Sequence, residues 1–549
     1  MSWTRSIYFE IKIHDDSPMV VATRDRFGSD ALQIGRDLEQ AQLIELIDTC
    51  IDEGCNYRAL VVGPRGIGKS TLLHNAEKTI RQDFDEATLL GARAEGLAAE
   101  QAYSLLAKLL REHFLSRVEH VTGQSDSTLD FHSIEEAMDF LDDSTQLRCA
   151  EFIADLIGVE TLPSPQLQAA MADPRLRRDQ LRLALRDYFG AMASERPLVL
   201  VLEDLHWADR SSLELLGELL DDLDDLPVAL VGSALPENEA GYEELFSEDK
   251  TVRIELRPLR KSQVKKLASA IAGRNLPDEF NKALVDRSAG NPLFVEHLVQ
   301  SYLDQGGESF EALTMPPTIE AAVQSNLDNL GNAAKELCKQ AALLNRDITI
   351  DALEALGVQE PATLLDMICR RGVLTRMNRG HETVYRFRNS SVRDVAYGML
   401  LQGQRKKSHR AAAQFLSVRV PSASNEIAAH FELADSNTDA AYWYAKATRE
   451  ASVRGDAEAV LRYSDNVLRL FPASSDFDLF MARSDALRFL GKREEQRSEL
   501  ESALQRAQNP TQKARASTEL AWSLSRTGPV SDALAMAEEA VLAGRESGE

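Results

Sequence analysis

Residues 63–70, Gly-Pro-Arg-Gly-Ile-Gly-Lys-Ser, have the types and spacing of a phosphate-binding loop. They follow an apolar run at 59–62 and lead into a helical pattern at 71–76. The glycines let the backbone curl until successive N–H groups point inward, and the following helix adds its positive end, so a polyphosphate fits there. The loop residues that we expect to bind the ligand are Gly63, Pro64, Arg65, Gly66, Ile67, Gly68, Lys69, Ser70 and Thr71.

Three side chains of this loop have distinct expected roles. Lys69 would reach the β and γ phosphates as a point charge and assist catalysis, the Ser70 hydroxyl would ligate Mg²⁺, and Thr71 would lie near the α phosphate. The alternative is a glycine turn that binds nothing. The complete G-x-x-x-x-G-K-S spacing between a strand and a helix argues against a bare turn. The expected ligands are therefore ATP or ADP with Mg²⁺.

Two adjacent acids, Glu203 and Asp204, end a buried apolar run at 198–202. Ligands of parallel sheets bind at the carboxyl ends of the strands, which places both carboxylates opposite the phosphate loop. We expect Glu203 to hold the Mg²⁺ shell and Asp204 to orient or deprotonate the attacking water. The sequence leaves open which acid is the general base. A helix-capping role is the alternative, but residues 211–214 already supply a capping box for the next helix.

The elements that must position these residues alternate between strand and helix. Short apolar runs predict buried strands, and helical patterns separate them. The runs lie at 59–62, 87–90, 198–202 and 228–231. All-apolar strands of this kind indicate a parallel sheet covered on both faces by helices. The sequence thus predicts an α/β fold of the P-loop NTPase class.

Beyond about residue 403 the pattern becomes wholly helical and repetitive. Gly455, Gly491 and Gly528 recur at intervals of about 36 to 37 residues, close to tetratricopeptide spacing, and each precedes a helix. Such arrays expose a concave face for peptides, proteins or small effectors. The sequence ends soon after a repeat helix, which we interpret as a truncated array or a missing output domain.

Bulk composition narrows the class of protein. The 549 residues predict several domains, and 44% hydrophobic with 27% charged residues is ordinary for a globular protein. The longest aliphatic run, 198–202, is too short to span a bilayer, and the N-terminus lacks a signal-peptide core. The net charge of −25 opposes nonspecific binding to nucleic acid. We therefore expect a cytoplasmic location, with neither membrane nor nucleic acid as a partner.

Four motifs in a fixed order resemble those of a known family. They are residues 34–39 (Ile-Gly-Arg-Asp-Leu-Glu), 63–70, 202–209 (Leu-Glu-Asp-Leu-His-Trp-Ala-Asp) and 290–294 (Gly-Asn-Pro-Leu-Phe). This order resembles the STAND-class signal-transduction P-loop ATPases, which have an AAA-like ATPase domain. The closest likeness is to the branch of MalT and LuxR-type regulators and adenylate-cyclase-associated ATPases. It covers about residues 30–540.

The resemblance implies a division into domains and two further site residues. The implied parts are an N-terminal leader at 1–30, a P-loop nucleotide-binding domain at 31–236, a helical lid at 237–312, a winged helix at 313–402 and a helical-repeat sensor at 403–549. Arg36 would contribute to the nucleotide site, and Pro292 would lie against the adenine or ribose. For the motif at 290–294, the alternative is a helix-to-helix turn that binds nothing.

Three positions depart from the family pattern. After the strand at 228–231 the family commonly has an arginine suited to sensing the γ phosphate, whereas this chain has Leu235. In the winged helix the family often has Phe-Arg-His, and here Asn389 replaces the histidine, without a titratable charge. Glu203 stands in place of the more usual aspartate. These changes predict slow hydrolysis, which suits a switch better than a motor.

The resemblance implies a signalling ATPase, acting for example in transcription regulation. Mg-ATP binding and slow hydrolysis would control conformation or homo-oligomeric assembly, and the repeats would sense an unknown protein or small-molecule effector. Two rival hypotheses stay open. The first is a nonenzymatic nucleotide-binding scaffold that acts through its repeats, and single-turnover hydrolysis separates it from the switch. The second is an AAA+ DNA-binding factor of the origin-recognition kind, which the net charge opposes and salt-dependent DNA binding would test.

Overall fold

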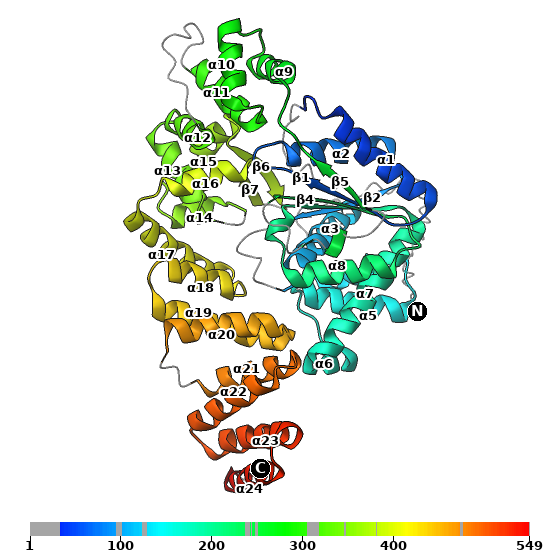
Figure 1. The fold of residues 1–549 in the computed structure, drawn as a ribbon, viewed down its shortest axis with the longest axis vertical. Helices are drawn as coiled ribbons and strands as arrows, with labels where there is room; N and C mark the ends of the chain where they lie inside the picture. The colour runs from blue at the N-terminus through cyan, green and yellow to red at the C-terminus, as the bar shows by residue number, and fades with distance from the viewer. Residues whose placement is uncertain are drawn as a thin grey trace, which may run out of the picture.

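A parallel α/β sheet is followed by a long tail that is almost entirely helical (Figure 1). This computed structural model describes residues 33–94, 102–122, 129–236, 242, 244–246, 251–304, 318–344, 347–379, 382–472 and 476–547. The architecture confirms the fold class expected from the sequence. The expected leader at 1–30 lies outside the described residues.

Five parallel strands form the central sheet in the order β2-β3-β4-β1-β5. They are β1 (Tyr57–Val62), β2 (Thr88–Arg93), β3 (Leu198–Glu203), β4 (Val228–Ala234) and β5 (Thr251–Glu255). Strands β1 to β4 are buried almost along their whole length because helices cover both faces of the sheet. Burial on both faces explains why these strands read as unbroken apolar runs.

Alternate residues of each strand enter different cores on the two faces. In β1, Leu60 and Val62 belong to one apolar cluster, and Ala59 and Val61 belong to the other. The helices of this part are α1 (Asp37–Glu53), α2 (Lys69–Asp83), α3 (Ser104–Thr122), α4 (Phe131–Glu136), α5 (Asp143–Ile157), α6 (Pro165–Ala172), α7 (Pro174–Glu195) and α8 (Arg210–Asp222). Full burial of one valine or leucine contributes roughly 1.5–3 kcal/mol, so the sheet is a firm base for the loops at its edge.

The sheet extends beyond residue 236, where the sequence led us to end the nucleotide-binding domain. Strand β5 pairs with β1 in register from Thr251 to Glu255, so the sheet reaches Glu255. The strand escaped prediction because it lies at an edge and its side chains are mostly exposed, rather than forming an apolar run. The remaining domain bounds stay predictions.

Two small helical units follow the sheet. We call the first the lid; it comprises α9 (Lys261–Ala272), α10 (Asp278–Ser288) and α11 (Pro292–Asp304). We call the second the winged-helix region; it comprises α12 (Ile319–Asp328), α13 (Asn332–Ala341), α14 (Ile350–Ala355), α15 (Pro361–Arg370), the antiparallel hairpin β6 (Leu374–Arg379) and β7 (Glu382–Phe387), and α16 (Ser390–Gly398). In Figure 1 the hairpin lies beside the central sheet.

The remaining helices stack as successive neighbours and form the lower arm of the molecule (Figure 1). We call them the repeat array. They are α17 (Gln402–Arg419), α18 (Ser424–Leu433), α19 (Asn437–Arg454), α20 (Ala457–Leu470), α21 (Phe477–Phe489), α22 (Arg493–Arg506), α23 (Pro510–Thr527) and α24 (Val530–Ser547). Each helix packs on the next, and α19 also touches α6 of the sheet domain. Among the described helices, none is long and apolar enough to cross a membrane.

Candidate functional site

The loop at 63–68 joins buried β1 to α2 and forms one wall of a cavity of about 440 Å³. Gly66 (φ +74°) and Gly68 (φ +102°) lie in the left-handed region, which glycine adopts without strain. A Cβ atom added to Gly66 would also lie 2.8 Å from Cβ of Leu293 in the lid. The loop therefore needs glycine both for its turn and for the close approach of the lid.

Lys69 is the first residue of α2, and its side chain reaches back to the phosphate loop that precedes it. Its Nζ donates to the carbonyl oxygens of Gly63, at 2.6 Å, and Pro64, at 3.2 Å. Burial lowers the pKa of Lys69 to about 8, while the nearby charges of Asp204 and Glu203 limit the fall. The structure thus places a cation within the ring of loop amides, where a phosphate would meet it.

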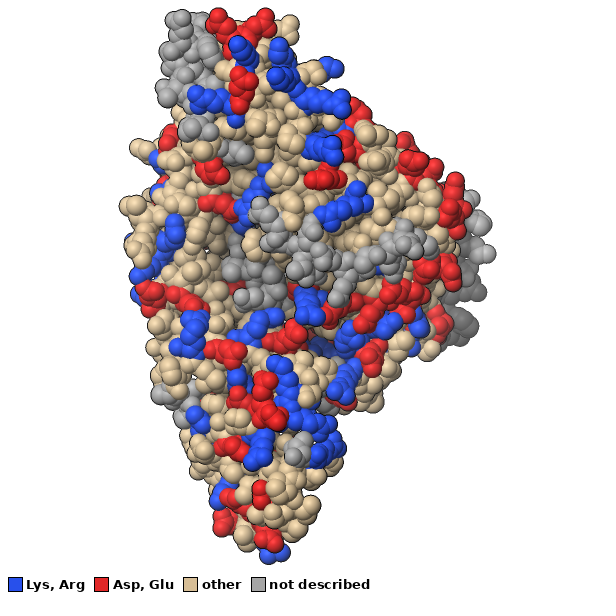
Figure 2. Space-filling view, in the orientation of Figure 1, with Lys and Arg blue, Asp and Glu red and all other residues tan. Residues whose placement is uncertain are grey.

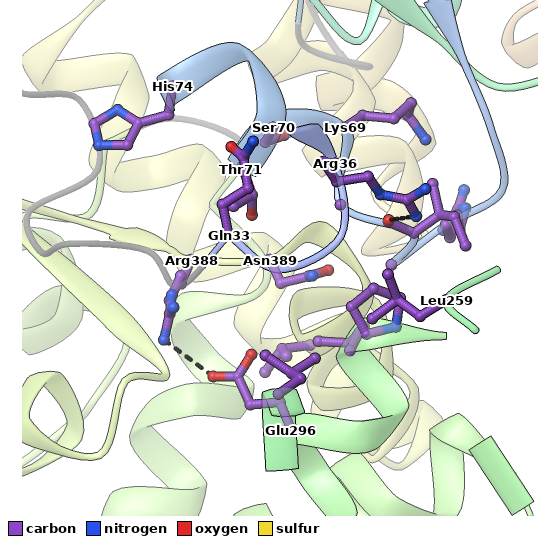
Figure 3. A pocket seen from close by; sticks show the side chains of 18 of the residues that line it. Gln33, Arg36, Lys69, Ser70, Thr71, His74, Leu259, Glu296, Arg388 and Asn389 are labelled. Atoms are coloured by element: carbon purple, nitrogen blue, oxygen red, sulfur yellow. Dashed lines mark hydrogen bonds and ion pairs between the residues drawn. The ribbon is translucent and has the colours of Figure 1, made fainter. Parts of the chain in front are cut away.

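Of the predicted loop residues, those from Arg65 to Thr71 line the cavity, whereas Gly63 and Pro64 do not. Ser70 and Thr71 stand at the N-terminus of α2, next to Lys69 (Figure 3). Arg36 also lines the cavity, but its guanidinium serves the loop itself: Nη2 donates to the carbonyl of Ile67 at 3.0 Å, and Nη1 pairs with Glu39 at 3.1 Å. Arg36 therefore braces the loop, and its contact with a ligand stays a prediction.

Glu203 ends β3 as a buried carboxyl group, 1% exposed. Its Oε2 has no hydrogen-bond partner among the described residues. Burial raises the pKa of Glu203 to about 7, with Asp204 adding to the rise, while Arg93 and a hydrogen bond with Ser70 oppose it. An orphaned carboxylate oxygen beside a serine hydroxyl is a set of hard oxygen donors that fits Mg²⁺ and its water shell.

Asp204 follows the strand in a left-handed conformation, φ 56° and ψ 43°, which costs a non-glycine residue about 1–2 kcal/mol. The Nε and Nη2 atoms of Arg93 donate to its Oδ2 at 2.7 and 2.6 Å, and its backbone N–H donates to Ser233 Oγ at 3.2 Å. Burial alone would raise the pKa of Asp204, but Arg93, His206 and Lys69 lower it below its usual value. A low pKa makes this carboxylate a weak base and favours the orientation of water over proton abstraction.

Sequence reasoning missed Arg93. It ends β2 and stands opposite Glu203 in the register of the two strands. The rule that identified Glu203 and Asp204 also applies to it, since Arg93 directly follows an apolar strand at its carboxyl end. The signal was therefore present, although the partner of Arg93 could not be read from the sequence.

The capping box expected at 211–214 is wrong. Asp209 caps α8, because its Oδ1 accepts from the Ser212 N–H at 2.8 Å. The same buried carboxylate also accepts from the N–H groups of Tyr103, at 2.7 Å, and Leu105, at 3.1 Å. One acid thus begins α8 and fixes the start of α3, so it outcompetes a local serine cap.

The opposite wall of the cavity comes from the lid and the winged-helix region. Lid residues Leu267, Ile271 and Pro292 line it with mainly apolar surface, which suits a base or sugar. Leu235 lines the cavity as well, at the position where the family resemblance implies an arginine. Asn389 is present in the wall, but its Oδ1 accepts from the Ser391 N–H at 2.8 Å and caps α16.

Hydrogen bonds tie the lid directly to the phosphate loop. Asn291 Nδ2 donates to the carbonyl of Arg65 at 3.0 Å, and the Leu293 N–H donates to the carbonyl of Gly66 at 3.2 Å. Asn291 Oδ1 accepts from the N–H groups of Leu293 and Phe294 at the start of α11. The motif at 290–294 is therefore a helix start that also holds the loop.

A second link joins the lid to the winged-helix region at the cavity. Glu296 of α11 forms an ion pair of 3.0 Å with Arg388, just after β7 (Figure 3).

His206 and Trp207, which follow Asp204 in the chain, also line the cavity. Burial lowers the pKa of His206, despite the opposing charge of Asp204. Side chains from three units of the chain thus enclose one space.

Comparison with known proteins finds a family that matches the part of the chain with the central sheet. Residues 33–231 match the family model described as an AAA ATPase domain. An uncharacterized protein of Rhizobium meliloti (strain 1021) is 28% identical over 325 residues, which are 56% of this chain and 31% of that protein. The aligned part is thus about a third of the relative's length.

The solved structures that are similar at low sequence identity include the following two. One is a Signal Transduction ATPase with Numerous Domains (STAND) protein with a tetratricopeptide repeat sensor from Pyrococcus horikoshii. It is 13% identical with a TM-score of 0.42, covering 95% of this chain and 78% of that one. The other is the ORC1 protein of Aeropyrum pernix in complex with DNA. It is also 13% identical, with a TM-score of 0.30, covering 68% of this chain and 94% of that one.

Proposed function

We propose that the AAA ATPase domain works here as a nucleotide-controlled switch. It binds Mg-ATP in the cavity, hydrolyses it slowly, and couples the bound nucleotide to the conformation or self-association of the chain. The repeat array senses a protein or small-molecule effector. The observation that carries the proposal is that the phosphate loop, Asp204 of the acid pair, the lid and the winged-helix region line the same cavity of about 440 Å³.

Binding rests on charge and backbone geometry. Loop N–H groups and the start of α2 attract the phosphates, and Lys69 supplies a cation already held within the loop. Ser70 and Glu203 would hold Mg²⁺, which neutralises phosphate charge when bound. Among the described residues no group of three or more His, Cys, Asp or Glu could hold a metal ion. The ion would therefore depend on phosphate and water oxygens for its remaining ligands, as Mg²⁺ commonly does.

Hydrolysis rests on the acid pair. Asp204 keeps its negative charge and orients water, while Arg93 fixes the position of its carboxylate. The same ion pair engages Oδ2 of Asp204, and Leu235 supplies no charge for the γ phosphate. Both features support a slow rate, since positioned polar groups provide most of the catalysis in phosphoryl transfer.

Coupling follows from the origin of the cavity walls. A ligand that differs between ATP and ADP alters the contacts of the lid and the winged-helix region as well as those of the loop. Differential contacts of this kind are what shift a population between two arrangements. The winged-helix region, whose last helix α16 ends at Gly398, leads directly into α17 of the repeat array, which gives the sensor a physical route to the site.

The nonenzymatic scaffold remains the second candidate, and the Arg93–Asp204 ion pair is the observation that favours it. A single-turnover assay with Mg-ATP decides between the two. The switch predicts release of phosphate within minutes to hours, dependent on Mg²⁺ and on Lys69. Stable, unhydrolysed ATP over a day in a folded, saturated protein would instead establish the scaffold.

Charge distribution gives no support to the DNA-binding alternative. On the face shown in Figure 2, basic and acidic side chains of the described residues are interleaved over both the sheet domain and the repeat array. Together with a net charge of −25, this pattern opposes a broad attraction to phosphate backbones. A salt-dependent affinity for duplex DNA would revive that alternative.

A further inference from the structure

Arg65, the third residue of the phosphate loop, touches both units that close over the loop. Its carbonyl oxygen accepts from Asn291 of the lid at 3.0 Å. Its guanidinium forms an ion pair with Asp394 on α16 of the winged-helix region, 329 residues further along the chain. The loop is thus tied to the winged-helix region through one side chain that also borders the cavity.

The ion pair between Arg65 and Asp394 is exposed to water, so it can open with little loss of stability. The Arg65 side chain is 48% exposed and that of Asp394 is 39% exposed, and ion pairs with such access to water contribute little to stability. The second carboxylate oxygen of Asp394, Oδ1, accepts from Arg393 Nη2 at 3.2 Å. Asp394 therefore keeps a cationic partner when Arg65 leaves, so the exchange of partners costs little free energy.

The charge of Arg65 reaches the phosphate end of the cavity. After burial, which is the largest cause in both groups, Arg65 is among the charges that lower the pKa values of Lys69 and His206. An arginine fork binds phosphate with two parallel hydrogen bonds, which are stronger than an exposed pair with a carboxylate. Because the loop amides hold the inner phosphates, a residue earlier in the loop meets the outermost one.

We propose that Arg65 senses the terminal phosphate of a bound nucleoside triphosphate by exchanging Asp394 for that phosphate. The exchange releases α16 from the loop, whereas a diphosphate leaves the ion pair in place. Arg65 thereby supplies the sensing arginine that Leu235 cannot supply. This inference rests on the proposed function, because it requires nucleotide in the cavity.

Calorimetric titration of the full chain with Mg-ADP and with the nonhydrolysable analogue β,γ-imido-ATP plus Mg²⁺ tests the exchange. Asp394→Asn frees Arg65 and should tighten binding of the analogue about tenfold, within the usual range of coupling between sites, with ADP affinity unchanged within about twofold. Arg65→Ala should weaken the analogue by about tenfold and leave ADP nearly unchanged. The control Asp351→Asn removes a comparably exposed partner, that of Arg419 at 3.2 Å, and should alter neither ligand.

A reversed pair, Arg65→Asp with Asp394→Arg, separates sensing from mere bridging. It keeps an ion pair between loop and α16 but places the wrong charge on the loop, so the preference for the analogue should stay lost. Recovery of that preference would overturn the proposal, as would an equal effect of Asp394→Asn on both nucleotides. Failure of the wild-type chain to bind either nucleotide would instead refute the proposed function itself.

Discussion

The region around the cavity and the repeat array differ in how far apart in the sequence their contacting residues lie. Around the cavity, polar side chains join residues far apart in sequence, such as Arg65 with Asp394 and Arg93 with Asp204. In the repeat array the links are local: Arg483 of α21 pairs with Asp465 of α20 and Glu499 of α22. A change at the cavity therefore affects several units at once, whereas most contacts in the array join a helix to the next helix or to the one after it.

The sheet domain and the repeat array meet at a small contact on α7. Arg175 Nη2 donates to the carbonyl of Phe489 at 3.2 Å, and its guanidinium lies 5.1 Å from the centre of that ring. Arg177 Nη1 donates to the carbonyl of Val453 at 3.4 Å. This contact and the packing of α19 on α6 join the array directly to the sheet domain, and a further connection runs through the winged-helix region.

The largest expected effect is at Lys69. Lys69→Ala should weaken Mg-ATP and Mg-ADP binding at least about 100-fold, because it removes the buried cation of the loop and leaves the sheet intact. Calorimetry measures the affinities, and circular dichroism checks the fold. Lys266→Ala, a change at an exposed lysine of α9, is the matched control and should bind as wild type does. Unchanged ATP affinity in folded Lys69→Ala protein would refute the nucleotide site.

The acid pair should show a somewhat smaller effect, on turnover rather than binding. Asp204→Asn should bind Mg-ATP nearly as well as wild type but hydrolyse it at least about tenfold more slowly, as expected for the loss of a positioned group. Glu203→Gln should instead weaken the dependence on Mg²⁺. Single-turnover assays over a Mg²⁺ series separate the two variants. If the two phenotypes are exchanged, the roles of the acids are reversed while the site itself survives.

Local sequence rules predicted the parts of this comparison that depend on neighbours in the chain. Apolar runs placed four strands, and the rule for strand ends pointed to Glu203, which ends β3, and to Asp204, which lines the cavity. The edge strand β5 was missed because its exposed side chains do not form an apolar run. Regular glycine spacing indicated the helical array for the same local reason.

The pairing of residues far apart in the chain could not be predicted from the sequence. Nothing near Arg93 marks Asp204 as its partner, and nothing near Arg65 marks Asp394, since tertiary packing alone brings these charges together. Asp209 shows the same limit, because its carboxylate serves α3 and α8 at once and replaces the serine cap that local spacing indicated. The region around the cavity depends on contacts between residues far apart in the sequence. Such contacts make the region hard to predict and also allow its parts to respond together.

Nucleotide affinity should depend on pH through Lys69. Burial lowers the pKa of this lysine to about 8, so the ammonium that phosphate binding requires is lost as pH rises above that value. Affinity for Mg-ADP should therefore fall about tenfold per pH unit above pH 8, as linkage to one proton requires. Calorimetry from pH 7 to 9.5 measures the slope. Lys69→Arg keeps its charge and should be flat, and a flat wild-type profile would contradict the assigned pKa.

The same lysine gives a stability prediction of opposite sign. The unfolded chain binds the Lys69 proton more tightly than the folded chain between pH 8 and 10.5. The nucleotide-free protein should therefore gain stability from this residue as pH rises through that window. Denaturant unfolding of wild type and Lys69→Ala measures it, and an equal pH dependence in both proteins would count against a buried lysine.

The smallest effect is expected at the contact between the sheet domain and the repeat array. Arg175→Ala removes an exposed cation–π contact worth about 0.5–1 kcal/mol. Because this contact belongs to the arrangement in which Arg65 pairs with Asp394, its loss should favour the other arrangement and tighten binding of an ATP analogue by about twofold to fivefold. Arg497→Ala, at an exposed arginine of α22 paired within its own helix, is the control. An effect of equal size in the control would show that the contact carries no coupling.

The central claim is that ATP and ADP stabilise different arrangements of the chain. Small-angle X-ray scattering of the 549-residue chain, saturated with Mg-ADP or with β,γ-imido-ATP and Mg²⁺, tests it most directly. The account predicts two distinct scattering curves, or a larger assembly with the analogue, and a single curve for Lys69→Ala under both conditions. Superimposable curves from wild-type protein with both nucleotides bound would contradict the switch and leave the scaffold in its place.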